Sequence, residues 1–218
     1  MNVREIVLEL KKHASEKNRL GMARFGINPT SALGVSIPVL REIAKKHKRQ
    51  HLLAAELWAT QIHEARILAA LIDDPKQVTE KQMEEWVEEF NSWDLCDQAC
   101  GNLFDKTAFA YEKAIEWSSS KKEFVKRAGF ALMACLAVHD KKASNTVFES
   151  FLPLIERESS DERNFVKKAV NWSLRQIGKR NPELNKKALK LARKLKESDS
   201  KPARWIGSDA VRELEKKF

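Results

Sequence analysis

Two stretches of this chain resemble each other in sequence: FVKRAGFAL (Phe124–Leu132) and FVKKAVNWSL (Phe165–Leu174). They begin 41 residues apart, and each places two cations after a Phe-Val pair and then continues with small and apolar residues. A helical pattern that recurs with a period near 40 residues is typical of solenoids, in which pairs of helices stack on their neighbours. The alternative is coincidence between two amphipathic helices.

Two weaker echoes support the repeat, HEARILAAL (His63–Leu71) and PARWIGSDAV (Pro202–Val211). All four stretches place a basic residue near the head of a predicted helix. If the second helix of each pair lines the concave side of a solenoid, these residues share one groove. They are Arg66, Arg127, Lys168 and Arg204.

The remaining pattern is helical. Apolar residues recur at spacings of three and four along most of the chain, and 7 Gly and 6 Pro leave few turn signals for a sheet protein. The best strand candidate, Ala32–Leu40, contains Pro38 and is interpreted as a loop. The expected helices are 2–18, 38–49, 51–59, 62–73, 79–91, 93–105, 107–118, 122–138, 143–155, 161–178, 183–196 and 202–217.

These features predict an all-α fold, a HEAT-like helical-repeat solenoid (α-α superhelix) with a basic concave groove. We expect one domain over residues 1–218, with capping helices in 1–50 and stacked helical pairs in 51–218. A solenoid of this kind has no need of a second copy, so a monomer is expected.

Composition narrows the setting. No apolar run approaches the ~18 residues that span a membrane, and the charged N-terminus is unlike a secretory signal. Three cysteines do not make a disulfide framework, and the chain is expected to be cytoplasmic. A zinc site is conceivable, but we expect no metal and no cofactor, because buried Cys is commonly a small hydrophobe. Its ligands would be Cys96, Cys100, Cys135 and His139.

The charge is uneven along the chain. Residues 121–218 hold 24 Lys+Arg against 13 Asp+Glu, a net charge of +11, whereas residues 1–120 have a net charge of −2. A basic half favours a polyanionic partner such as nucleic acid, which would make the protein nucleoid-associated. Lysines that merely face water are the alternative.

One face of the predicted helix 161–178 combines cations with a tryptophan. Lys168, Trp172, Arg175 and Lys179 follow steps of four, three and four, so they share a face opposite the apolar stripe. Cations can contact phosphates there while the ring lies against a sugar or base. A packed core tryptophan is the alternative. Further candidates for DNA contact are Lys126, Arg127, Arg204 and Trp205.

The stretch NSWDLCDQ (Asn91–Gln98) places acid beside an aromatic residue. With Asn91 or Ser92 as N-cap, Asp94 falls in the first helical turn, where a carboxylate is favourable. Asp97 lies four residues after Trp93, on the same face. A carboxylate beside an aromatic ring can stabilise a developing cation or orient water. This spacing is weak evidence alone.

Taken together, the motifs resemble the AlkD-like family of DNA alkylation repair glycosylases. They occur in the same order and cover most of the chain. They are MARFGI (Met22–Ile27), LGVSIPVLREIAKK (Leu33–Lys46), NSWDLCD (Asn91–Asp97), FVKRA (Phe124–Ala128), FVKKAVNWSLRQIGK (Phe165–Lys179) and ARWIGSDAVREL (Ala203–Leu214).

The resemblance implies hydrolysis of the N-glycosidic bond of cationic N3- or N7-alkylated purines, such as 3-methyladenine and 7-methylguanine, in duplex DNA. It places the catalytic Asp at Asp97, the lesion-flanking tryptophans at Trp93 and Trp172, and the groove arginine at Arg127. It further implies excision without flipping the base into a closed pocket. This chain departs from the family at Ser92, where an aromatic residue is frequent.

Two other functions remain open at this point. Some family members bind DNA without excising bases, so a binding protein for damaged or branched DNA is one alternative. The other is a solenoid that binds protein through its groove.

Overall fold

The computed structural model describes residues 2–218, and their regular secondary structure is helical throughout. The helices fall into two compact units, residues 1–108 and 109–218. No helix in the described part of the chain has the length and apolarity needed to cross a bilayer.

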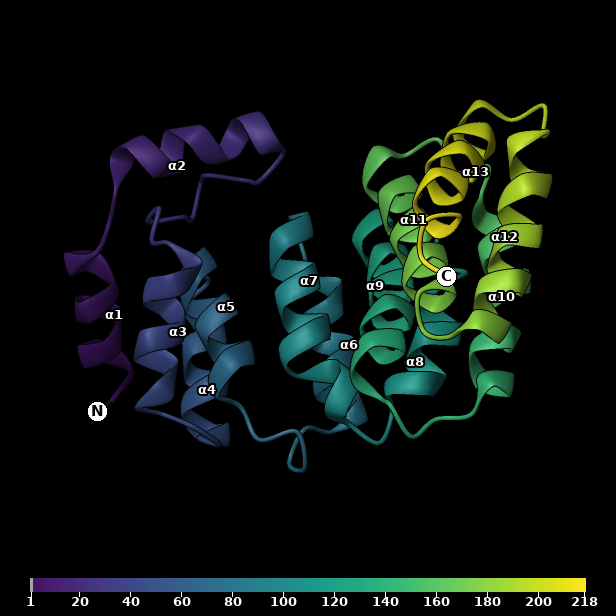
Figure 1. Ribbon diagram of the computed structural model, residues 1–218. Coiled ribbons are helices and arrows are strands. Elements are labelled where there is room, and N and C mark those ends of the chain that lie inside the picture. The colour runs from purple at the N-terminus through teal and green to yellow at the C-terminus, as the bar shows by residue number, and fades with distance from the viewer. Residues whose placement is uncertain (1) are drawn as a thin grey trace. The chain divides into compact units, whose positions relative to one another are not determined.

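Unit 1 contains seven α-helices among its described residues, with short 3₁₀ turns after the second and the seventh (Figure 1). The helices are α1 (Val3–Lys12), α2 (Glu16–Met22), α3 (Ile37–Lys45), α4 (His51–Ala59), α5 (His63–Ile72), α6 (Glu80–Glu88) and α7 (Trp93–Asn102). The 3₁₀ turns are η1 (Ala23–Phe25) and η2 (Phe104–Lys106). The predicted helix 93–105 thus ends at Asn102.

The single helix predicted over residues 2–18 is wrong, because the chain breaks between α1 and α2. Ser15 begins the second helix as its N-cap, and its side chain accepts a hydrogen bond from the backbone nitrogen of Asn18. Serine competes with the helical backbone for hydrogen bonds, so it favours a helix start over a helix interior.

A buried carboxylate organises the loop before α3. Glu64, on α5, is 1% exposed and accepts hydrogen bonds from the backbone nitrogens of Leu33, Gly34 and Val35 at 2.8, 2.6 and 3.2 Å. Gly34 has φ +78°, and a Cβ atom there would lie 2.2 Å from the backbone oxygen of Ser15. The segment interpreted as a loop is therefore confirmed as one over residues 32–36, whereas residues 37–40 form the first turn of α3. Helix α5 holds this loop against α2.

Unit 2 contains α8 (Ala110–Trp117), α9 (Glu123–His139), α10 (Asn145–Glu158), α11 (Asn164–Gly178), α12 (Pro182–Lys196) and α13 (Lys201–Leu214). They form three consecutive pairs, in which α9, α11 and α13 are the second members and pack side by side (Figure 1). Among the first members, α10 packs against α12. Unit 2 thus has two helical layers, as stacked pairs require.

The repeated FVK stretches occupy equivalent places in this stack. Phe124 and Phe165 lie at the starts of α9 and α11, and their rings stack with centroids 5.6 Å apart. The Nη1 atom of Arg127 donates to the backbone oxygen of Phe165 at 2.6 Å. The repeat is therefore real in three dimensions, since the first motif contacts the second through corresponding residues.

Candidate functional site

The first two turns of α7 carry the predicted pair in unit 1. Ser92 is the N-cap, and Trp93 and Asp97 lie one turn apart on α7, both half-buried. The indole Nε1 of Trp93 donates to the backbone oxygen of Phe25 in η1 at 2.9 Å. The carboxylate and the ring therefore lie on neighbouring turns of one helix face, and a bond to a distant loop holds the ring.

Asp94 has a second role besides starting the helix. It lies in the first turn of α7 as predicted, and its Oδ2 atom is 2.9 Å from Nε2 of His63, a ring that is 3% exposed. Burial opposes ionisation of Asp94, but the hydrogen bond and charge of His63 hold the pKa of that carboxyl below its ordinary value. The sequence does not predict this contact between His63 and Asp94, because no motif links residues 31 positions apart.

Ser92 is fully buried, at 0% exposure. The position where the family frequently has an aromatic residue therefore points into unit 1 here. A larger ring would need space inside the packed unit rather than an opening beside Trp93.

In unit 2, Lys126 and Arg127 are 9% and 5% exposed. The Nζ atom of Lys126 pairs with Glu158 and lies 3.2 Å from Oδ2 of Asp161. A lysine whose charge is neutralised inside the protein is a poor phosphate ligand, so its placement argues against the predicted DNA contact by Lys126.

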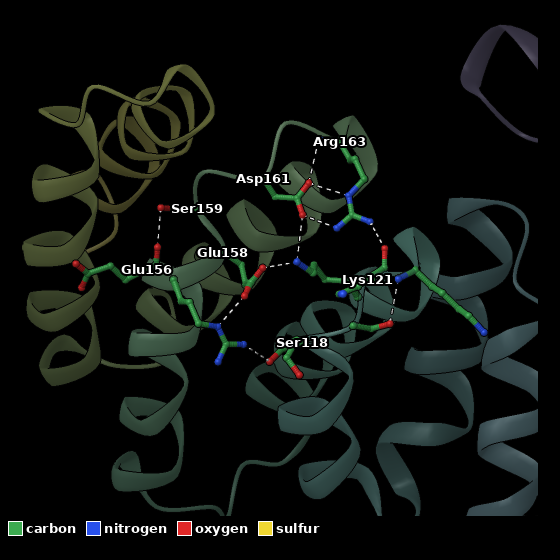
Figure 2. Close-up of polar contacts among 12 residues, drawn as sticks. Ser118, Lys121, Glu156, Glu158, Ser159, Asp161 and Arg163 are labelled. Carbon is green, nitrogen blue, oxygen red and sulfur yellow. Dashed lines mark hydrogen bonds and ion pairs between the residues drawn. The ribbon is translucent and has the colours of Figure 1, made fainter.

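The partners of Lys126 belong to a wider network (Figure 2). Arg163 donates from Nε to Asp161 at 3.0 Å and from Nη1 to the backbone oxygen of Lys121 at 2.7 Å. Burial raises the pKa of the Asp161 carboxyl. The hydrogen bonds from Arg163 and Lys126 outweigh burial and lower this pKa to about 2. The network ties the loop before α11 to the start of α9.

The predicted face of α11 is only partly available for phosphates. Lys168 is exposed and Trp172 is half-buried. Arg175 pairs with Glu213 on α13 and lies 3.6 Å from Asp209, while Nζ of Lys179 lies 2.6 Å from Glu213. Acids on α13 therefore neutralise two of the three predicted cations.

The last predicted candidates lie at the start of α13. Arg204 is exposed, and its Nη1 atom donates to the backbone oxygens of Ser198 and Asp199 at 2.9 and 2.7 Å. Trp205 is 41% exposed, and Nζ of Lys167 lies 4.9 Å from its ring centroid. Both side chains are at the surface, where they can reach a partner.

The four echoed cations differ in burial. Arg66 is 6% exposed, pairs with Glu89 and lies over the ring of Trp58, so it is a structural residue like Lys126. Arg127 is likewise buried, whereas Lys168 and Arg204 are exposed. Equivalent sequence positions thus place a cation near the start of each helix, but the side chains differ in how deeply they are buried.

The described residues offer no cluster of three or more His, Cys, Asp or Glu side chains that could hold a metal ion. All three cysteines are buried thiols.

Comparisons with known proteins fit this arrangement. The sequence profile of the family described as DNA alkylation repair enzyme matches residues 6–214. Curated proteins gave no match. Among solved structures, the chain is similar to one described as "a new family of proteins related to the HEAT-like repeat DNA glycosylases with affinity for branched DNA structures". The identity is 23%, the match covers 100% of this chain and 97% of that one, and the TM-score is 0.82, which confirms the predicted HEAT-like fold.

Proposed function

The chain belongs to the DNA alkylation repair enzyme family, and we propose that it is a DNA glycosylase acting on duplex DNA. Its substrates are purines made cationic by alkylation at N3 or N7, and its products are the free base and an abasic site. The single observation that carries the proposal is the pairing of Asp97 with Trp93 on one face of α7.

Excision of a cationic purine requires few catalytic groups from the protein. An alkylated purine already carries a positive charge, so it leaves with the bonding electrons and needs no general acid. The C1′–N bond breaks, positive charge develops on the sugar, and water attacks C1′ and loses a proton. The carboxylate of Asp97 stabilises the developing charge and orients the water. The face of Trp93 adds cation–π stabilisation.

Unit 2 supplies the duplex contacts in this proposal. The inner helices are α9, α11 and α13, the second members of the three pairs. Lys168 on α11 and Arg204 on α13 are exposed cations, and Trp172 lies on the face of Lys168. Arg175 and Lys179 would need to exchange their carboxylate partner for phosphates. The free energy lost with the ion pairs offsets part of the free energy gained on binding DNA.

A second candidate function is recognition of branched or damaged DNA without base excision. The solved structure with the same fold is described as having affinity for branched DNA. The buried serine at position 92, where the family frequently has an aromatic ring, also favours this candidate, because the site offers one ring fewer.

Release of free methylated purine from alkylated duplex DNA separates the two candidates. We expect release by the wild type and a loss of at least about a hundredfold in Asp97→Asn, which keeps the shape but removes the charge. Glu56→Gln, an equivalent change at an exposed residue of unit 1, is the control and should leave release unchanged. DNA binding without any base release by the wild type would refute the glycosylase and favour the second candidate.

A further inference from the structure

The most basic helix of the chain lies outside the predicted DNA-binding face. Helix α12 carries six cations and one acid, Glu183, in residues 182–196. All six cations are exposed: Lys186, Lys187, Lys190, Arg193, Lys194 and Lys196. Unit 2 has a net charge of +10, and α12 accounts for half of it.

Much of this charge is not neutralised. Lys187, Arg193 and Lys194 pair with Glu149, Glu215 and Glu156. Within the described residues, no ion pair involves Lys186, Lys190 or Lys196. The α11 face shows the opposite balance, because Glu213 engages both Arg175 and Lys179. Helix α12 therefore keeps three exposed cations that no carboxylate of the described residues neutralises, whereas the α11 face keeps only Lys168.

The outer face of α12, defined by Lys186, Lys190 and Arg193, lies opposite the buried face of the helix, and Arg193 at its end pairs with Glu215 just after α13. The opposite face of the helix is buried and apolar, with Leu184, Ala188 and Leu195 at its centre. That face packs against α11 and α13 (Figure 1). A duplex bound along the exposed residues of α11 and α13 leaves the outer face of α12 open.

The composition of this face identifies the class of partner. A membrane-bound helix needs apolar side chains to insert between lipids, but the exposed residues of α12 are all charged or proline. Ammonium and guanidinium groups spaced along one helix face suit the phosphates of a nucleic-acid backbone. Such contacts position DNA without reading its sequence.

We propose that the outer face of α12 binds the phosphate backbone of a second DNA segment, distinct from the one contacted by the inner helices. This inference rests on the DNA binding proposed above, but not on base excision. It gives the protein two DNA-binding surfaces on unit 2, so a junction or a crossing of two duplexes can engage both at once.

The test replaces the cations by neutral side chains of similar length. In the triple variant, Lys186, Lys190 and Arg193 all become Gln, and these exposed changes should leave the thermal midpoint unaltered. The control variant removes the same charge from unit 1, at Lys48, Lys76 and Lys81. Affinity is measured over a range of salt concentrations for a short duplex and for a four-way junction with arms of that length.

We expect the triple variant to bind the junction roughly tenfold more weakly, with the salt slope reduced by about 0.9 for each lost phosphate contact. Its affinity for the short duplex should change less than about twofold. Unchanged junction affinity, or an equal loss for duplex and junction, would refute the second surface. If the wild type bound neither DNA, both this inference and the proposed DNA binding would fail.

Two further readouts keep the outcome specific. Acetylation of Lys186 and Lys190, followed by mass spectrometry, should be suppressed by the junction and not by the duplex. Vesicles rich in phosphatidylserine should bind the wild type and the triple variant equally weakly. Strong vesicle binding that the triple variant loses would identify a membrane as the partner and overturn the proposal. Base release, scored separately, reports on the glycosylase alone.

Discussion

The indole nitrogen of Trp93 donates a hydrogen bond to the backbone oxygen of Phe25 at 2.9 Å, across 68 residues of sequence. Phe25 ends η1, and Gly26 after it has φ 73°, a left-handed conformation that glycine adopts at little cost. The MARFGI motif is thereby joined to α7, whose first two turns carry the proposed catalytic pair. The orientation of the ring depends on this loop as much as on its own helix.

Replacing Trp93 by Phe tests that dependence, since it removes the N–H donor and keeps an aromatic face. We expect the free energy of unfolding in urea to fall by about 0.5–1.5 kcal/mol, and base release to slow. Phe25→Ala is the matched change, because it truncates an exposed side chain and keeps the backbone acceptor. Equal base release by Trp93→Phe and the wild type would show that the bond does not position the ring.

The two glycines around α2 should respond to alanine with opposite signs. Gly34→Ala brings a Cβ atom within 2.2 Å of the Ser15 oxygen at φ +78°, so we expect a loss of more than about 3 kcal/mol. Gly21 lies within α2, and a methyl group added there would meet no neighbour within 4 Å, so alanine should add about 0.5–1 kcal/mol. Urea denaturation measures both, and a stable Gly34→Ala variant would contradict the close packing.

Two lysines predicted to contact DNA should separate into a structural and a binding residue. Lys126→Gln leaves Glu158 and Asp161 without their shared cation, and we expect a loss of about 3–5 kcal/mol in stability. Lys168→Gln, at an exposed position, should leave stability unchanged and reduce the salt slope of duplex binding by about 0.9. A stable Lys126→Gln variant with weakened DNA binding would reverse these roles.

Asp161 predicts how unit 2 responds to acid. Its folded-state pKa is about 2 against an ordinary value of 3.8, so the unfolded chain takes up the proton first as pH falls. The stabilisation is complete above about pH 5 and is lost between about pH 4 and pH 2. Asp161→Asn should be less stable at neutral pH and lose stability less steeply over that acidic window. Parallel pH profiles for the two proteins, measured by thermal unfolding, would contradict this.

Local periodicity predicted most of the helices. The three-and-four spacing of apolar residues locates α9, α11 and α12 within a few residues, because each stripe must be buried whatever its partner is. The break between α1 and α2 escaped prediction, although Ser15 is a residue type favoured at helix starts. The expected single domain over residues 1–218 stays a prediction. The structure divides into two compact units, and each of them is helical.

The sequence by itself determined the helical pairs, their repeat, and the shared face of Trp93 and Asp97, because these follow from the geometry of one helix. Only the tertiary structure decided which charges are available. Lys126, Arg175 and Lys179 meet carboxylates 32 to 38 residues away, whereas Lys186 and Lys190 meet none in residues 2–218. Whether a cation is neutralised depends on which helices pack beside it, and no local pattern records that choice.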